Sequence, residues 1–190
     1  SILIGCTLVV FLVFNASVIS SLYGETYSGA KLSLIILLLA GGVSCFGSGI
    51  GPFIYSKGYT KFGLMTNVLW TLTFLIFSII FINSLGAIAL SLGMFFGYCL
   101  NLVVSILYLY IKSEMDISIL YKSFFGIILM CLICSTALFF QNQFSSLYVF
   151  IISIIASILI FFFLINYIIS TDVKLGIFKV LKKIIGKHYG

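Results

Sequence analysis

Six long apolar stretches, separated by short polar breaks, make up most of this chain. They cover residues 2–22, 32–55, 62–82, 85–111, 123–140 and 147–169. Each is close to the length of about 20 residues that an α-helix needs to cross the hydrocarbon core of a bilayer. A strand of a membrane barrel would be about ten residues long and would alternate in polarity, which these stretches do not. Because backbone groups in lipid need partners within the protein, the pattern predicts an all-α, polytopic membrane protein with six transmembrane helices.

The positions of the charged residues agree with this prediction. All fourteen charged side chains lie outside the six apolar stretches. A charge at the centre of a bilayer costs about 3 kcal/mol on insertion scales, so a membrane excludes it from a span. The chain is 63% hydrophobic and 7% charged, whereas soluble domains have roughly 25% charged residues. Membrane lipid is therefore an expected partner.

The lysines predict the orientation of the chain in the membrane. Nine of the ten lysines fall in the second break, in the fourth break or after the sixth stretch. The positive-inside rule places this side in the cytoplasm, together with the C-terminus. Residues 24–29, 83–84 and 141–146 would then face outside. Since the lysines are dispersed over loops and the tail, we expect no nucleic-acid partner.

The last twenty residues form a separate element. After the six-helix domain of residues 1–170, residues 171–190 place apolar side chains at helical spacing with lysines between them. This pattern predicts a short, basic, amphipathic helix that lies on the inner leaflet. Each lysine near an anionic surface adds about 1 kcal/mol to such binding.

The apolar stretches contain no set of residues that suggests catalysis. All four acidic residues lie in the breaks or the tail, and no His/Glu cluster or Ser/His/Asp set is present in a stretch. Cys131 and Cys134 have the spacing of a redox or metal pair, but no cationic residue or further ligand is near them in the sequence. We interpret the five cysteines as small apolar residues. We expect no enzymatic activity, catalytic residue, cofactor or metal.

Small and polar residues recur at helical spacing inside two stretches. Gly93, Gly97 and Asn101 are four residues apart in the fourth stretch, and the third stretch contains Asn67 and Thr71. Residues at this spacing share one face of a helix. Glycines allow two helices to approach closely, and an amide can form a hydrogen bond across the contact. Two interpretations remain open: tight helix packing, or a polar cavity that part of these residues lines.

The second stretch is predicted to be the most deformable. It contains Gly47, Gly49, Gly51 and Pro52. Glycine costs a helix about 1 kcal/mol relative to alanine, and proline removes a backbone hydrogen bond. These residues are candidates for a hinge, and a static kink is the alternative. In the first stretch, the isolated Asn15 is predicted to form a hydrogen bond to another helix.

Three short segments at the ends of stretches carry a family resemblance. Residues 22–30 read Leu-Tyr-Gly-Glu-Thr-Tyr-Ser-Gly-Ala, residues 49–61 are glycine-rich and end in a lysine-containing loop, and residues 83–89 read Asn-Ser-Leu-Gly-Ala-Ile-Ala. In order and spacing they resemble segments of bacterial flippases for lipid-linked oligosaccharides (O-antigen type), in the multidrug/oligosaccharidyl-lipid/polysaccharide exporter superfamily. The family's second glycine is missing from residues 83–89, and the last two stretches carry no motif.

The resemblance implies a fold and a function. The chain would be the C-terminal portion of a two-lobe flippase, as its start within an apolar stretch, without an initiator methionine, also suggests. The N-terminal lobe would be a partner. The whole protein would translocate a polyprenyl-pyrophosphate-linked oligosaccharide across the bacterial inner (cytoplasmic) membrane by alternating access, for surface polysaccharide synthesis. The cationic residues with which such flippases meet the pyrophosphate have no counterpart in these stretches.

Three other functions stay open. A small-molecule antiporter of the same superfamily would more often need an ionisable residue within a span. A glycan-assembly enzyme, such as a polymerase, would tend to have large outer loops, whereas the outer breaks here are short. A structural membrane subunit that packs against a partner would have the same glycine-rich helix faces.

Overall fold

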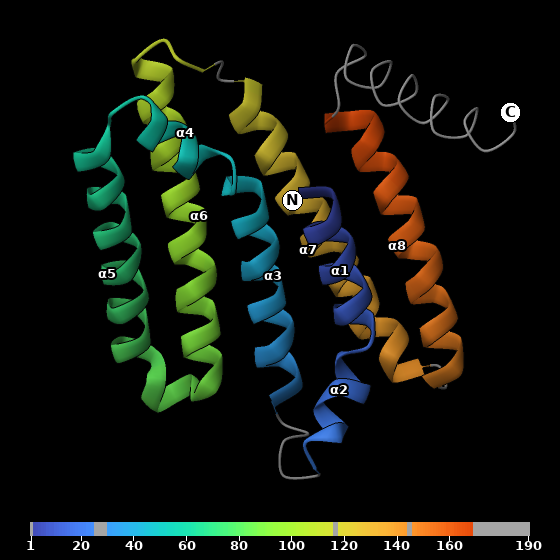
Figure 1. Cartoon of the computed structure of the whole chain (residues 1–190). Coiled ribbons are helices and arrows are strands. Elements are labelled where there is room, and N and C mark those ends of the chain that lie inside the picture. The colour runs from blue at the N-terminus through green and yellow to red at the C-terminus, as the bar shows by residue number, and fades with distance from the viewer. Residues whose placement is uncertain (1, 25–29, 116–117, 144–145, 169–190) are drawn as a thin grey trace, which may run out of the picture.

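The described part of the chain is entirely helical. The computed structural model describes residues 2–24, 30–115, 118–143 and 146–168, and these residues contain no strand. The helices are α1 (Ile2–Phe14), α2 (Ala16–Leu22), α3 (Lys31–Gly47), α4 (Ile50–Ser56), α5 (Thr60–Leu85), α6 (Ala87–Ile111), α7 (Ser118–Gln143) and α8 (Ser146–Ile168) (Figure 1). The predicted all-α class is confirmed for these residues. The predicted tail helix, residues 171–190, lies outside them.

Several helices are long and apolar enough to cross a membrane. By length and composition these are Lys31–Ser56, Thr60–Leu85 and Ala87–Ile111, and the bent pair α1 and α2 makes a fourth if it counts as one span. α7 and α8 contribute shorter apolar segments, Phe125–Phe139 and Tyr148–Phe162. The structure is therefore compatible with a multi-pass membrane protein. On this measure it gives three or four spans and does not support the predicted six.

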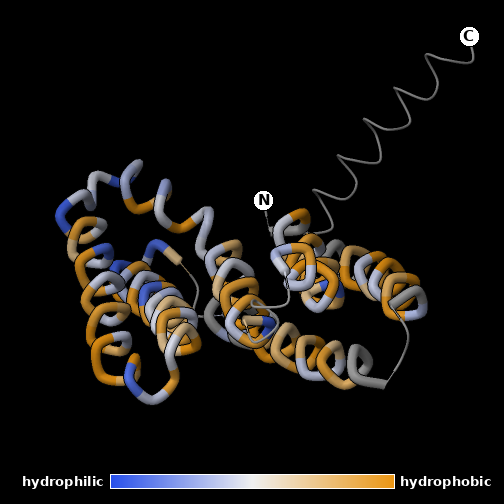
Figure 2. The backbone as a smooth tube through the Cα atoms, turned by 90° about the horizontal axis from the view of Figure 1, so that it is seen from below, coloured by the Kyte–Doolittle hydropathy of each residue, from blue (hydrophilic) through white to orange (hydrophobic). Residues whose placement is uncertain are grey.

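The helices lie side by side in one bundle. α5 packs on α6, α6 on α3, α3 on α1, and α1 on α8, while α7 contacts α1, α3 and α6 (Figure 1). The most deeply buried side chains include Val10 of α1, Ile35 of α3 and Ile106 of α6. Hydrophobic residues recur along the helices, interspersed with more polar ones, as Figure 2 shows. The core thus lies between central helices, with α5 at one edge.

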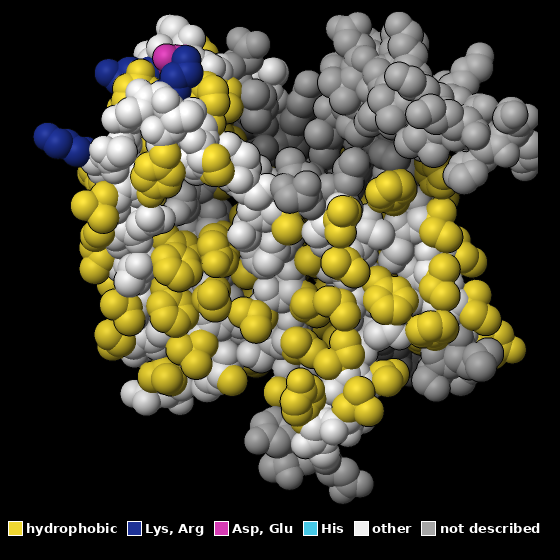
Figure 3. Space-filling model, in the orientation of Figure 1, with side chains coloured by type: hydrophobic (Ala, Val, Ile, Leu, Met, Phe, Trp, Pro, Cys, Tyr) yellow, Lys and Arg dark blue, Asp and Glu magenta, His cyan; other side chains and the backbone are white. Residues whose placement is uncertain are grey.

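Large hydrophobic side chains also cover much of the outer surface. In α5, Leu64, Met65 and Ile79 are each about two-thirds exposed or more. On the visible face in Figure 3, hydrophobic side chains extend over the length of the helices, whereas the lysines gather at one end. Such an apolar surface is unfavourable in water and is satisfied by lipid.

The first predicted span is bent where Asn15 interrupts it. α1 and α2 meet at an angle of 70°. The Asn15 side-chain amide donates hydrogen bonds to the Phe11 carbonyl at 2.8 Å and to the Ser153 hydroxyl of α8 at 3.1 Å. The predicted interhelical bond of Asn15 is thereby confirmed. The bend was not predicted, because an apolar stretch carries no sign that a side-chain amide will satisfy a backbone carbonyl.

Candidate functional site

The second predicted span is broken within the proposed hinge. α3 ends at Gly47, Ser48 and Gly49 form a turn, and α4 begins at Ile50. The Ser48 N–H donates to the Cys45 carbonyl, three residues back, at 3.3 Å, and the Ser48 hydroxyl donates to the same carbonyl at 2.9 Å. Pro52 has no N–H with which to continue the helical ladder back to residue 48. The local sequence therefore explains the break.

Close packing does not explain the glycines of this break. A Cβ atom at Gly49 or Gly51 would meet nothing within 4 Å, and one at Gly47 would meet only the Leu102 side chain, at 3.7 Å. Gly51 has a separate reason, since a Cβ atom before proline is crowded in the helical conformation. Gly49 has helical backbone angles, φ −89° and ψ −21°, which any residue adopts. Replacing Gly49 by alanine would thus change mainly the conformational freedom of the backbone at this position.

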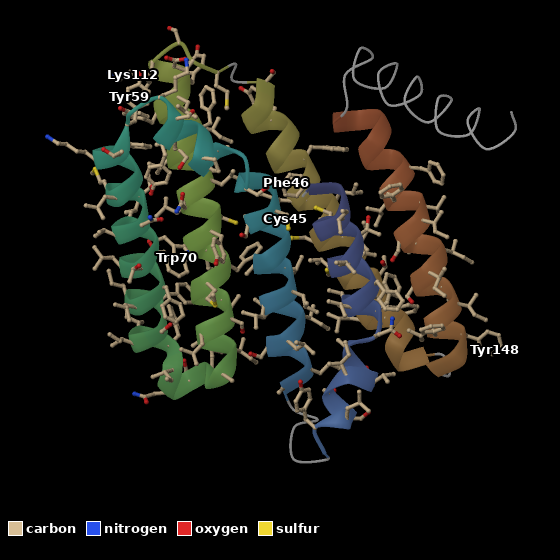
Figure 4. The ribbon with its side chains drawn as sticks, in the orientation of Figure 1. Cys45, Phe46, Tyr59, Trp70, Lys112 and Tyr148 are labelled. Carbon is tan, nitrogen blue, oxygen red and sulfur yellow. The ribbon has the colours of Figure 1, made fainter. Side chains whose placement is uncertain are left out.

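Gly93 and Gly97 lie where α6 comes closest to α5. A Cβ atom at Gly93 would be 3.0 Å from the Phe74 carbonyl oxygen. At Gly97 it would be 2.8 Å from Cδ1 of Trp70 and 3.3 Å from the Trp70 carbonyl oxygen. Trp70 points from α5 towards α6 in Figure 4. At these two positions the small residues thus serve the helix contact, and they line no cavity.

A pocket of about 320 Å³ lies between α3, α4, α5 and α6, and its largely apolar lining includes several amide and hydroxyl groups. It brings together candidate hinge residues and candidate cavity residues: Gly47, Gly51, Pro52, Asn67 and Asn101. The remaining candidates, which are Gly49, Thr71, Gly93 and Gly97, do not line it. The face of α6 predicted from helical spacing therefore has two roles. Gly93 and Gly97 pack against α5, and Asn101 lines the pocket.

Hydrogen bonds of the pocket amides connect the surrounding helices. The Asn101 amide donates to the Thr66 carbonyl of α5 at 3.4 Å, and the Ser105 hydroxyl donates to the Asn101 side-chain oxygen at 3.1 Å. The Asn67 amide donates to the Tyr55 hydroxyl of α4 at 3.5 Å. None of the residues that line the pocket is charged. The pocket thus offers amides and hydroxyls among apolar side chains, and it carries no charge.

Tyr55 was not predicted as part of a site. A Cβ atom at Gly63 would lie 2.8 Å from the Tyr55 ring, so the ring rests directly on the α5 backbone. Together with the Asn67 contact, this fixes the end of α4 against α5 on one side of the pocket. The available signal was the position of Gly63, four residues before Asn67 on the same helix face. The partner of Gly63 could not be read from the sequence.

An ion pair joins two breaks at the lysine-containing end of the bundle. Lys57 Nζ, after α4, lies 2.6 Å from Glu114 Oε2, after α6. The hydrogen bond and the charge of Glu114 raise the pKa of Lys57 above its ordinary value. Lys112 lies at the same end, as Figure 4 shows, with its Nζ 5.9 Å from the centre of the Tyr108 ring. The second and fourth breaks therefore meet at one end, as the predicted orientation requires.

The described residues contain no group of three His, Cys, Asp or Glu side chains that could hold a metal ion. All five cysteines are free thiols, and Cys6 and Cys134 are buried. The candidate site therefore consists of amides, hydroxyls and aromatic rings. Such groups bind and orient a ligand by hydrogen bonding and packing.

Comparison of the chain with protein-family models, with curated proteins and with solved structures found no match.

Proposed function

We propose that this chain is the C-terminal portion of a multi-pass membrane transporter, and that the pocket between α3, α4, α5 and α6 belongs to its translocation path. The observation that carries the proposal is an uncharged pocket with amide and hydroxyl groups beside a broken helix, within segments apolar enough to cross a membrane. Irregular backbone at membrane depth is tolerated where it lines a cavity or is buried in protein. Discontinuous helices that border a binding site are typical of secondary transporters.

The finer proposal takes its substrate from the flippase resemblance. The whole protein would move a polyprenyl-pyrophosphate-linked oligosaccharide across the bacterial inner membrane for surface polysaccharide synthesis. α7 and α8 would be the fifth and sixth spans, and the lysine-containing end would face the cytoplasm. An N-terminal lobe of the same protein would supply the cations for the pyrophosphate, since the pocket has none.

Alternating access would require α4 to move relative to α3 about Ser48 and Gly49. The contacts that hold α4 in the arrangement observed include the buried side chains of Ile50 and Ile54, the Tyr55 ring on Gly63, and the Lys57–Glu114 ion pair at its end. The ion pair is exposed to solvent, where such pairs contribute little to stability. Breaking and re-forming the ion pair would therefore add little to the barrier of a transport cycle.

The test is deletion of the encoding gene, followed by complementation with the gene in its natural length. We expect the deletion strain to lose surface polysaccharide and to accumulate lipid-linked oligosaccharide on the cytoplasmic side of the membrane. Wild-type protein and a Gly41→Ala control should restore export, since a Cβ atom at Gly41 meets nothing within 4 Å. Unchanged polysaccharide in the deletion strain would refute the proposed substrate.

A structural membrane subunit is the second candidate. The observation in its favour is the close contact of α5 with α6, combined with an outer apolar face of α5 that no described helix covers. A subunit of this kind would fail in complementation when that outer face is changed. It would tolerate changes of Asn67 and Asn101 in the pocket.

A further inference from the structure

We propose that the pocket between α3, α4, α5 and α6 binds an uncharged, hydroxyl-rich group, such as a sugar unit, and that it excludes phosphate. This inference rests on the proposed transport function and specifies which part of a substrate this half of the protein would hold. Three features of the pocket lead to it: unused hydrogen-bonding groups, the absence of charge, and flat aromatic walls.

Several polar groups of the pocket have no hydrogen-bond partner among the residues that the structure describes. These are the Ser44 hydroxyl, the Tyr98 hydroxyl and the side-chain oxygen of Asn67. Asn101 uses only one amide hydrogen, in a long bond of 3.4 Å to the Thr66 carbonyl. Within a membrane-spanning bundle, lipid cannot satisfy such groups. A ligand or water that both donates and accepts hydrogen bonds has to meet them.

The charge of the pocket decides between ligand classes. Phosphate and carboxylate groups are bound most strongly by arginine, lysine or metal ions, and no arginine, lysine or histidine lines this pocket. The start of α4 lines it, but that helix has only seven residues. The nearby Lys57 is paired with Glu114 at the end of α4. A hydroxyl group is neutral and acts as donor and acceptor at once. It therefore matches the amides and hydroxyls of the pocket.

The size and position of the pocket suit a single headgroup. Its volume of about 320 Å³ is at the low end of the range for small-molecule sites. Tyr55 and Tyr98 add aromatic surface against which the carbon–hydrogen face of a sugar ring can pack. Asn67 comes seven positions after Thr60, where α5 begins, which places it about 10 Å below the lysine-containing end. A headgroup at the membrane surface can reach this depth.

The single tryptophan of the chain provides the assay. The Trp70 ring lies 5.3 Å from the ring of Tyr98, which lines the pocket. The protein in its natural length, with Trp70 kept as its only tryptophan, would be placed in phosphatidylcholine nanodiscs built with a tryptophan-free scaffold. Trp70 fluorescence would be recorded while glucosyl diacylglycerol, free maltose or phosphatidic acid is added. We expect a saturable change with a glucosyl-bearing probe and none with phosphatidic acid. A response to glucosyl diacylglycerol alone would identify a lipid headgroup, and one to maltose as well a free sugar.

Variants identify the groups that bind. Asn67→Leu and Asn101→Leu should each weaken binding by roughly up to tenfold, the effect of one lost hydrogen bond. The control Thr73→Val should not, since Thr73 bonds to the Leu69 carbonyl of its own helix at 2.8 Å and lines no pocket. If circular dichroism shows that Asn101→Leu has lost helix, Asn67→Leu decides, because Asn67 is exposed.

Three outcomes would overturn the inference: no saturable response to either sugar probe, an equal response to phosphatidic acid, or unchanged affinity in Asn67→Leu. Binding and transport are separable. Sugar binding without any export defect in the deletion strain would leave the inference standing and refute the proposed function. An export defect in the deletion strain with no sugar binding would refute the inference and leave the proposed function standing.

Discussion

Replacing Gly93 and Gly97 together by alanine tests the contact between α5 and α6. A Cβ atom at Gly97 would lie 2.8 Å from Trp70 Cδ1, and one at Gly93 would lie 3.0 Å from the Phe74 carbonyl oxygen. Carbon atoms pack best at about 3.5–4.0 Å, so the helices must separate or the Trp70 ring must turn. Because backbone oxygens take part in both contacts, rotation of a side chain alone cannot relieve them.

The size of the effect follows from two opposing terms. Overpacking costs about 1–3 kcal/mol at each site, while alanine is better than glycine in a helix by about 1 kcal/mol. The double variant should therefore be destabilised by roughly 2 kcal/mol. The matched control is Gly41→Ala, where a Cβ atom meets nothing within 4 Å. That substitution should stabilise the protein by about 0.4–1 kcal/mol.

The measurement is unfolding in detergent micelles, followed by far-UV circular dichroism. Trp70 emission should also shift in the double variant, because its ring lies against Gly97. The prediction is a difference in sign between the double variant and the Gly41→Ala control. If both move the free energy of unfolding in the same direction, the close approach of α5 and α6 described here is wrong.

Three further predictions concern the break, the bend and the ion pair. Gly49→Ala should raise stability by about 0.4–1 kcal/mol, and it should lower export if Gly49 is a hinge. Full export in the more stable variant would support the alternative interpretation, a static kink. Asn15→Leu should destabilise the protein by about 1–3 kcal/mol through its lost bonds to Phe11 and Ser153, and an unchanged unfolding midpoint would contradict the role given to Asn15. Glu114→Gln should lower the pKa of Lys57, measured by NMR of methylated lysines, because Glu114 raises it. The folded-state pKa of Lys57 exceeds the ordinary 10.5, so the pair's contribution is complete below that pH and is lost as the pH rises through the raised value. A pKa of Lys57 that is the same in both proteins would argue against the pair.

Much of the fold could be predicted from the apolar pattern, because the bilayer imposes the same rule on every span. The starts of α5 and α6 fall within two residues of the predicted boundaries. The break after Gly47 falls within the segment predicted as a hinge. The bend at Asn15, within the span predicted over residues 2–22, could not be placed, because it involves the Ser153 hydroxyl of a distant helix.

The candidate site could be predicted only as a set of faces. Helical spacing alone assigned Gly93, Gly97 and Asn101 to one side of α6, with packing and cavity both open. The tertiary structure decided between them position by position, because the α5 backbone lies against the glycines, whereas Asn101 bonds to the Thr66 carbonyl of α5 and lines the pocket. It also brought Tyr55 of α4 to Gly63 of α5, a partner that the sequence does not identify.

The sequence by itself determined that this chain is helical, that it suits a membrane, and that its lysine-containing breaks share one end. These properties follow from whether each segment is apolar or charged, which decides whether it lies in lipid or in water. They do not depend on which helices pack against one another. Only the tertiary structure decided that the first span bends at Asn15, which small residues pack, and which polar groups line a pocket. Those outcomes depend on distances between residues far apart in the chain, such as Asn67 and Asn101, and local patterns carry no information about them.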